Sequence, residues 1–238
     1  MKPKNVMSAA AILACTFSGG IAFAQSTLIG STMNNGDFES AIAGGKQDFT
    51  STASSTSPVA YWGSLTGASD TDSGAQVGGN CVYQGSNGSY YKEGEGAFNL
   101  VTDYTIAAGD LFSLTYYAYN TYPNGSTIPQ SVWLFSQANP SGAAYSYAPM
   151  ATLATDAENL VNGNPWTEYT LTYTATLADA GNDIGVAIQN NSTGSSDYTA
   201  ADDFTLTVTP VPEPSAYALI GAGLVGFVFV RRFRPASV

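Results

Sequence analysis

The stretches DLFSLTYYAY, residues 110–119, and EYTLTYTATL, residues 168–177, decide the fold, because both alternate apolar and polar side chains with a period of two. In the first stretch one face carries Phe112, Leu114 and Tyr116. The opposite face carries Ser113, Thr115, Tyr117 and Tyr119. Such segments predict β-strands that are buried on one face only, so the apolar faces of two sheets must meet across a common core.

Several other segments show the same signals. We expect further strands at 34–39, 76–83, 97–105, 131–136, 148–153, 183–190 and 203–209. Glycine- and asparagine-rich turns separate them. About nine short strands predict an all-β fold, a two-sheet antiparallel β-sandwich of the jelly-roll type. The Ser/Thr/Gly-rich stretches 43–57 and 64–79 are expected to be long mobile loops.

The two ends of the chain differ from this body. Lys2 and Lys4 precede a mostly apolar stretch that ends in Ala22-Phe-Ala24, which is typical of a secretory signal peptide. At the other end the order is Pro212-Glu213-Pro214, an apolar run over 216–230, and then a basic cluster. That cluster is Arg231, Arg232 and Arg234. Arginines after an apolar helix prefer the cytoplasmic face, so they act as a membrane stop and leave the body outside.

This tail resembles the PEP-CTERM sorting tail of Gram-negative bacteria. The resemblance implies recognition at Pro212, Glu213 and Pro214 by an exosortase, a membrane processing enzyme, after a transient stay in the inner membrane. An ordinary, permanent membrane anchor is the alternative. We therefore predict three parts, a signal peptide (1–24), a β-sandwich (25–210) and a sorting segment (211–238), in a protein secreted to the cell surface.

Composition narrows the function of the body. All but one of the 18 acidic residues lie in it, whereas only Lys46 and Lys92 of the seven basic residues do, so its net charge is about −15. This charge excludes nucleic acid and anionic lipid as partners. The chain has no histidine, which removes the usual catalytic triads and most zinc sites. Cys81 is the single cysteine of the body and is expected in a strand.

Carboxylates stand at both ends of the predicted sandwich. They are Asp37 and Glu39 at the start, and Asp202 and Asp203 at the end. If the terminal strands pair, these side chains meet, and a bound Ca²⁺ would relieve their repulsion, since calcium accepts six to eight oxygen ligands. Exposed carboxylates at strand ends are the alternative interpretation.

The same residues carry a second resemblance. Four segments are similar to parts of carbohydrate-binding modules with the galactose-binding-like jelly roll: Asn35-Gly-Asp-Phe-Glu39, Asp202-Asp-Phe-Thr-Leu206, Ala107-Ala-Gly-Asp-Leu-Phe-Ser-Leu114 and Trp166-Thr-Glu-Tyr169. The resemblance implies a structural calcium near Glu39 and Asp202, and it implies polysaccharide as a partner.

Aromatic residues on strand surfaces are the candidate ligand contacts. Tyr117 and Tyr119 point away from the predicted core, and Trp133 alternates with apolar neighbours. Aromatic rings stack on the apolar faces of sugars, but aromatic residues also favour β-sheets for packing alone. The two interpretations stay open at this point.

Three functions follow from these patterns. The first is a non-catalytic protein of the cell surface or extracellular matrix, and the second is a module that captures polysaccharide. The third is a glycan-active enzyme with paired carboxylates. Its candidate carboxylates, none of which has an orienting partner in a motif, are Glu93, Glu95, Glu158 and Glu168. We therefore predict that the protein is not an enzyme.

Overall fold

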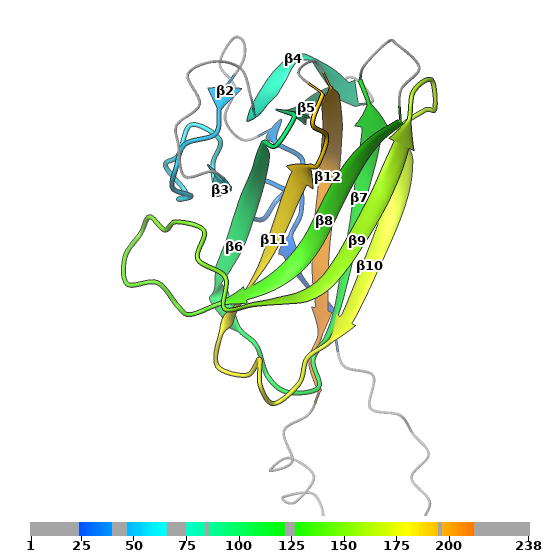
Figure 1. Cartoon of the computed structure of the whole chain (residues 1–238). Helices are drawn as coiled ribbons and strands as arrows, with labels where there is room; N and C mark the ends of the chain where they lie inside the picture. The colour runs from blue at the N-terminus through cyan, green and yellow to red at the C-terminus, as the bar shows by residue number, and fades with distance from the viewer. Residues whose placement is uncertain are drawn as a thin grey trace, which may run out of the picture.

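The structure is a computed structural model that describes residues 24–39, 47–65, 75–83, 86–121, 127–194 and 197–211. These residues form twelve β-strands and no α-helix (Figure 1). The strands are β1 (Ser26–Ile29), β2 (Gln47–Asp48), β3 (Trp62–Ser64), β4 (Ala75–Tyr83), β5 (Ser86–Lys92), β6 (Gly96–Thr105), β7 (Leu111–Asn120), β8 (Thr127–Gln137), β9 (Ala151–Val161), β10 (Thr167–Thr174), β11 (Asp183–Asn190) and β12 (Tyr198–Thr209). Residues 1–23 of the predicted signal peptide, and the tail from 212 onward, lie outside the described residues.

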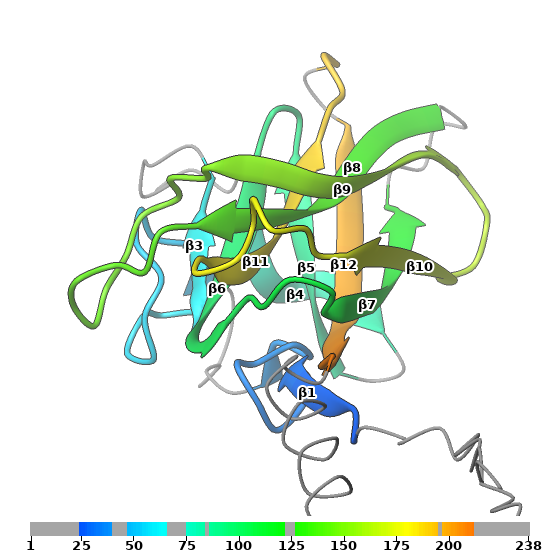
Figure 2. The ribbon, with the colours of Figure 1, turned by 90° about the horizontal axis from the view of Figure 1, so that it is seen from below.

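The strands form two antiparallel sheets that pack face to face, as Figures 1 and 2 show. The seven-stranded sheet has the order β10-β7-β12-β5-β4-β2, and β1 also pairs with β12. The five-stranded sheet has the order β3-β6-β11-β8-β9. The predicted all-β, two-sheet antiparallel sandwich is therefore confirmed.

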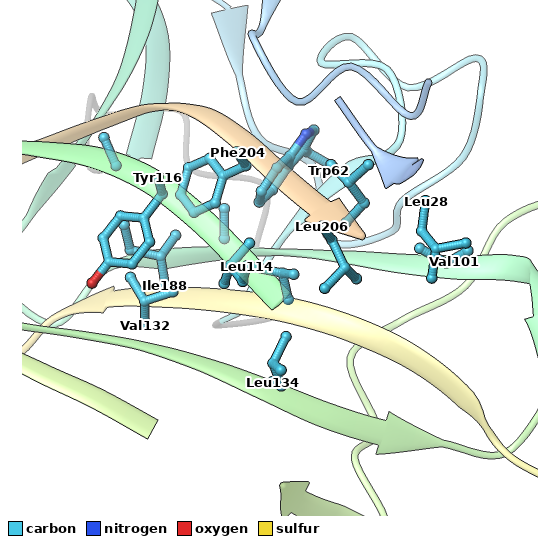
Figure 3. Close-up of a cluster of buried hydrophobic side chains, with 14 of the residues drawn as sticks. Leu28, Trp62, Val101, Leu114, Tyr116, Val132, Leu134, Ile188, Phe204 and Leu206 are labelled. Atoms are coloured by element: carbon cyan, nitrogen blue, oxygen red, sulfur yellow. The ribbon is translucent and has the colours of Figure 1, made fainter. Parts of the chain in front are cut away.

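The core lies between the two sheets and is built from the alternating residues of the strands (Figure 3). Leu114 and Leu206 come from the seven-stranded sheet, while Val132, Leu134 and Ile188 come from the other. All five are fully buried. The period-two pattern of β7 and β12 thus predicted the core-facing side of both strands correctly.

Aromatic rings fill one side of this core. Phe204 stacks on Tyr116 with ring centroids 5.6 Å apart, and Trp62 and Phe38 pack against Phe204 at 5.1 and 5.9 Å. The Trp62 indole N–H donates a hydrogen bond to the Asn35 carbonyl oxygen, at 2.9 Å. The segment 30–39 therefore helps close the sandwich on this side.

A second hydrophobic cluster covers the outer face of the five-stranded sheet. Phe98 and Phe135 lie there beneath Tyr145 and Tyr147, which belong to the connection between β8 and β9. The ring of Phe135 lies so close to Gly185 that a Cβ at this glycine would overlap it. Strand β11 is consequently buried on both faces, although its alternation predicts burial on one.

The prediction of a first strand at 34–39 is wrong. Asn34, Asn35 and Phe38 adopt positive φ angles of 54°, 52° and 56°, so the segment forms turns, and the first strand is β1. Strands β1, β2 and β3 have only two to four residues, too few to show a period.

The boundaries of some longer strands also differ from those that the sequence predicted. β12 begins at Tyr198 rather than 203, and β4 occupies the end of the predicted loop 64–79. Cys81 lies in β4, as expected. Within 43–57, Ala53 exchanges two backbone hydrogen bonds with Tyr145, at 2.8 and 3.0 Å, so that part is tied to the body.

Candidate functional site

Tyr117 and Tyr119 lie on the outer face of the seven-stranded sheet, as predicted, and both are half-buried. The Tyr117 hydroxyl donates a hydrogen bond of 2.8 Å to Glu168 Oε2 on the neighbouring strand β10. The ring of Tyr119 stacks on Trp166, with centroids 5.5 Å apart and an interplanar angle of 26°. β7 and the chain that leads into β10 thus hold three aromatic rings and one carboxylate together.

The aromatic surface continues across β12. Ala200 pairs with Tyr119 on one side and with Tyr90 of β5 on the other, so these side chains share the outer face. Tyr198, two residues before Ala200, contacts Tyr90 edge-on at 6.1 Å. We call Tyr90, Tyr117, Tyr119, Trp166 and Tyr198 the aromatic face. Its members are half-buried, so each ring still presents surface to solvent.

Trp133 is not part of the aromatic face. It lies on β8 of the five-stranded sheet, and its indole N–H donates a hydrogen bond of 3.0 Å to the Tyr147 hydroxyl. It packs against the second hydrophobic cluster. Of the three predicted ligand residues, the structure brings Tyr117 and Tyr119 together and places Trp133 on the opposite sheet.

Sequence reasoning missed Tyr90, Trp166 and Tyr198 as partners of Tyr119. Trp166 lies two residues before Glu168, so the strand period places it on the outer face. Tyr198 stands in the same relation to Ala200. Extending the period beyond the expected starts of both strands would have found Trp166 and Tyr198, whereas Tyr90 lies on β5, which was not predicted.

The carboxylates at the two ends of the domain do come together. β1 pairs with the end of β12, and the Phe204 amide donates a hydrogen bond of 2.9 Å to the Gly36 carbonyl oxygen. Gly36 lies against Phe204 so closely that a Cβ would overlap its carbonyl oxygen. This contact carries Asp37 to the β-bulge of β12 that contains Asp203.

Asp202 is the buried member of this group, and its exposed fraction is 0%. Its Oδ1 accepts a hydrogen bond of 2.7 Å from the Asp203 amide, while Oδ2 has no partner among the described residues. Burial raises the pKa of Asp202 to about 8, and the charges of Asp203, Asp37 and Glu39 act in the same direction. Burial and the charges of Asp37 and Glu39 also raise the pKa of Asp203.

The chemistry of this group fits a hard cation. An unpartnered buried carboxylate oxygen beside further carboxylates is a calcium-type donor set, and backbone carbonyls can complete it. Within the described ranges, however, no three Asp, Glu, Cys or His side chains are grouped closely enough to hold a metal by themselves. Backbone oxygens or water would therefore supply most of the ligands.

The acidic residues considered for catalysis are dispersed. Glu93 and Glu95 flank Gly94 in the turn between β5 and β6. Glu158 lies on β9, and Glu168 lies on the outer face of β10. The structure does not bring these four carboxylates into one site.

Comparison with known proteins identifies the end of the chain. The profile of the PEP-CTERM protein-sorting motif matches residues 210–232, which include Pro212, Glu213, Pro214, Arg231 and Arg232. Residues 210–232 are a PEP-CTERM sorting motif. The motif marks an exported protein that is anchored transiently in a membrane. Residues 212–232 lie outside the described part of the structure, as does Arg234. Within the described part, no helix is long and apolar enough to span a membrane.

The body matches solved structures in fold. A Stig cyclase, Fisc, from Fischerella sp. TAU, in complex with an indole compound, has 19% sequence identity and a TM-score of 0.55, covering 79% of this chain and all of that one. The CBM22-1 xylan-binding domain of Paenibacillus barcinonensis Xyn10C has 11% identity and a TM-score of 0.47, with coverage of 80% and 99%. No curated protein matches the chain. The similarity to the cyclase shows the fold of the body.

Proposed function

We propose that the chain is an exported, non-catalytic protein of the bacterial cell surface or extracellular matrix, and that its aromatic face binds neutral polysaccharide. The sorting motif supports the location, and an exosortase-type enzyme is the processing partner. The resemblance of the tail supports a Gram-negative source. The single observation that supports binding is the row of half-buried rings around Ala200, with Glu168 held beside Tyr117.

The chemistry of this face suits sugars better than charged ligands. Aromatic rings pack against the C–H faces of pyranose rings, and a carboxylate accepts hydrogen bonds from hydroxyl groups. Among the described residues Lys92 is the only lysine or arginine, which disfavours acidic polymers.

The test is binding of the full chain to a panel of neutral and acidic polysaccharides, measured by affinity electrophoresis and glycan arrays. We expect Trp166→Ala to weaken binding about tenfold, because an aromatic contact contributes about 1.4 kcal/mol. Trp133→Phe, on the opposite sheet, is the matched control and should bind like the wild type. If the wild type binds no glycan, the polysaccharide proposal fails and a matrix protein without glycan affinity remains.

We further propose that Asp202, with Asp37, Glu39, Asp203 and nearby backbone carbonyls, holds a structural Ca²⁺. The unpartnered Oδ2 of buried Asp202 supports this proposal. The ion would join the segment 30–39 to β12.

A further inference from the structure

Gln130 is a polar side chain in an otherwise apolar part of the core. It lies on the core-facing side of β8 between Ile128 and Val132, and its exposed fraction is 2%. Neither Oε1 nor Nε2 of its amide has a hydrogen-bond partner among the described residues. A buried amide without hydrogen-bond partners destabilises the folded state, so we expect a ligand to contact the polar atoms of Gln130.

Two carboxylates on the next strand share the face on which Gln130 lies. Glu158 lies directly opposite Gln130 in the pairing of β8 with β9, so both side chains share one face. Asp156, two residues before Glu158, faces the same side. The Tyr116 hydroxyl, which comes from the other sheet, confirms this orientation by donating a hydrogen bond of 2.9 Å to Asp156 Oδ2.

Two carboxyl groups lie together here, and the described residues place no basic side chain beside them. Burial, a hydrogen bond with Asp156 and the charge of Asp156 raise the pKa of Glu158. Burial, together with the charges of Glu158 and Asp156, also raises the pKa of Tyr169, which stacks on Tyr116 at 5.4 Å. Lys92, the one cationic side chain in the described ranges, is on β5 and pairs with Tyr198.

The location gives a small ion access from solvent. β9 and β10 are the edge strands of their sheets and lie side by side at one side of the sandwich (Figure 1). Asp156 and Glu158 are half-buried along this seam between the sheets, as is Tyr169 on β10. The carboxylates thus face the solvent side of the seam, and Gln130 lies deeper.

We propose that Asp156, Glu158 and Gln130 bind a divalent, oxygen-preferring cation such as Ca²⁺ at the seam between β9 and β10. The two carboxylates neutralise the charge of the ion, and Gln130 Oε1 supplies a deeper, uncharged ligand. The Tyr116 hydroxyl donates to Asp156 Oδ2 and holds this carboxylate at the seam. Water entering at the seam completes the coordination. This site is separate from the proposed calcium at the ends of β1 and β12.

The experiment uses the full chain, stripped of metal with EDTA, and follows tyrosine-sensitised Tb³⁺ luminescence. Asp202→Asn serves as the background, because it removes the other proposed site. In this background we expect saturable emission that Ca²⁺ displaces, since Tyr116 and Tyr169 are next to the ligands. Adding Glu158→Gln or Asp156→Asn should weaken Tb³⁺ binding at least tenfold, and adding Gln130→Leu should weaken it as well.

The matched control in the same background is Asp103→Asn, which removes an exposed carboxylate from β6 and should leave Tb³⁺ affinity unchanged. Far-UV circular dichroism and the thermal midpoint verify that each variant is folded. The isosteric substitutions at positions 156 and 158 test the same proposed site independently of each other. Unchanged Tb³⁺ affinity in folded Glu158→Gln and Asp156→Asn variants would overturn the proposal, as would absence of emission from the Asp202→Asn background.

Discussion

Asp183 illustrates how one residue can set the pH response of this sandwich. It begins β11, is fully buried, and neither carboxylate oxygen has a hydrogen-bond partner among the described residues. Burial, with a smaller contribution from the charge of Asp103, raises its pKa. The folded state therefore holds a proton at Asp183 more tightly than the unfolded chain does.

The Asp183→Asn variant tests this statement. The pKa of Asp183 is higher in the folded state than in the unfolded chain. The stability that Asp183 contributes is therefore complete below about pH 4, and it is lost as the pH rises through the pKa of the folded state. We expect the variant to match the wild type near pH 4 and to have the higher thermal midpoint near pH 8. The readout is thermal unfolding across this range in EDTA. Equal thermal midpoints of the variant and the wild type at pH 8 would show that the folded protein does not bury a charged Asp183 carboxylate.

Gly36 gives a second prediction at the residue scale. Gly36→Ala should destabilise the fold by about 2 kcal/mol or more, because the new Cβ overlaps the Phe204 carbonyl oxygen. Gly94→Ala is the matched control, since nothing lies within 4 Å of its Cβ position and only its φ of 74° opposes the change. It should cost about 1 kcal/mol. Urea unfolding of both variants decides whether the close contact or the dihedral angle matters more.

Among the elements, β7, β10 and the second half of β12 were the most predictable, because apolar or aromatic residues on one face alternate with mostly polar ones on the other. Their faces placed Tyr117 and Tyr119 correctly on the outside. The short strands β1 and β3 could not be found by period, since pairing with β12 and β6 creates them. Trp133 could not be assigned to a sheet from sequence, because strand order depends on contacts between distant segments.

Calcium removal tests the proposed ion that links β1 and the segment 30–39 to β12. With EDTA we expect faster amide hydrogen exchange in β1 and in residues 30–39, and a lower thermal midpoint, because unscreened carboxylates then repel one another. The Asp202→Asn variant should lose most of this response to EDTA. Magnesium, which prefers a stricter octahedral site, should restore less protection than calcium. Identical exchange of this segment with and without calcium would contradict the ion at this joint.

The whole molecule combines an acidic sandwich with a sorting motif at its end. A net charge of about −15 in the body keeps exported copies soluble and apart from one another. Export and a transient membrane anchor are properties of the tail, whereas the proposed polysaccharide binding belongs to the sheet, so the two can be tested separately.

Processing is the prediction at this scale. In cells that contain the processing enzyme, mass spectrometry should find the C-terminus of the mature chain near Pro212. Replacing Pro212, Glu213 and Pro214 together with alanine should leave the tail attached and the protein in the membrane fraction. Thr209→Ser, just before the motif, should be processed normally. A wild-type chain that keeps its tail in these cells would instead be a permanently anchored protein.

The antiparallel pairing of Ser26 with Val208 has a consequence for how the molecule stands on a membrane. Both ends of the body emerge at the same pole, and β12 extends about 35 Å from there to Tyr198. A chain held by its tail therefore displays Tyr90, Tyr119 and Tyr198 at the far pole of the body, away from the membrane. The proposed binding face would then be open to polysaccharide while the molecule is still tethered, and cleavage of the tail would release a protein that already carries its ligand.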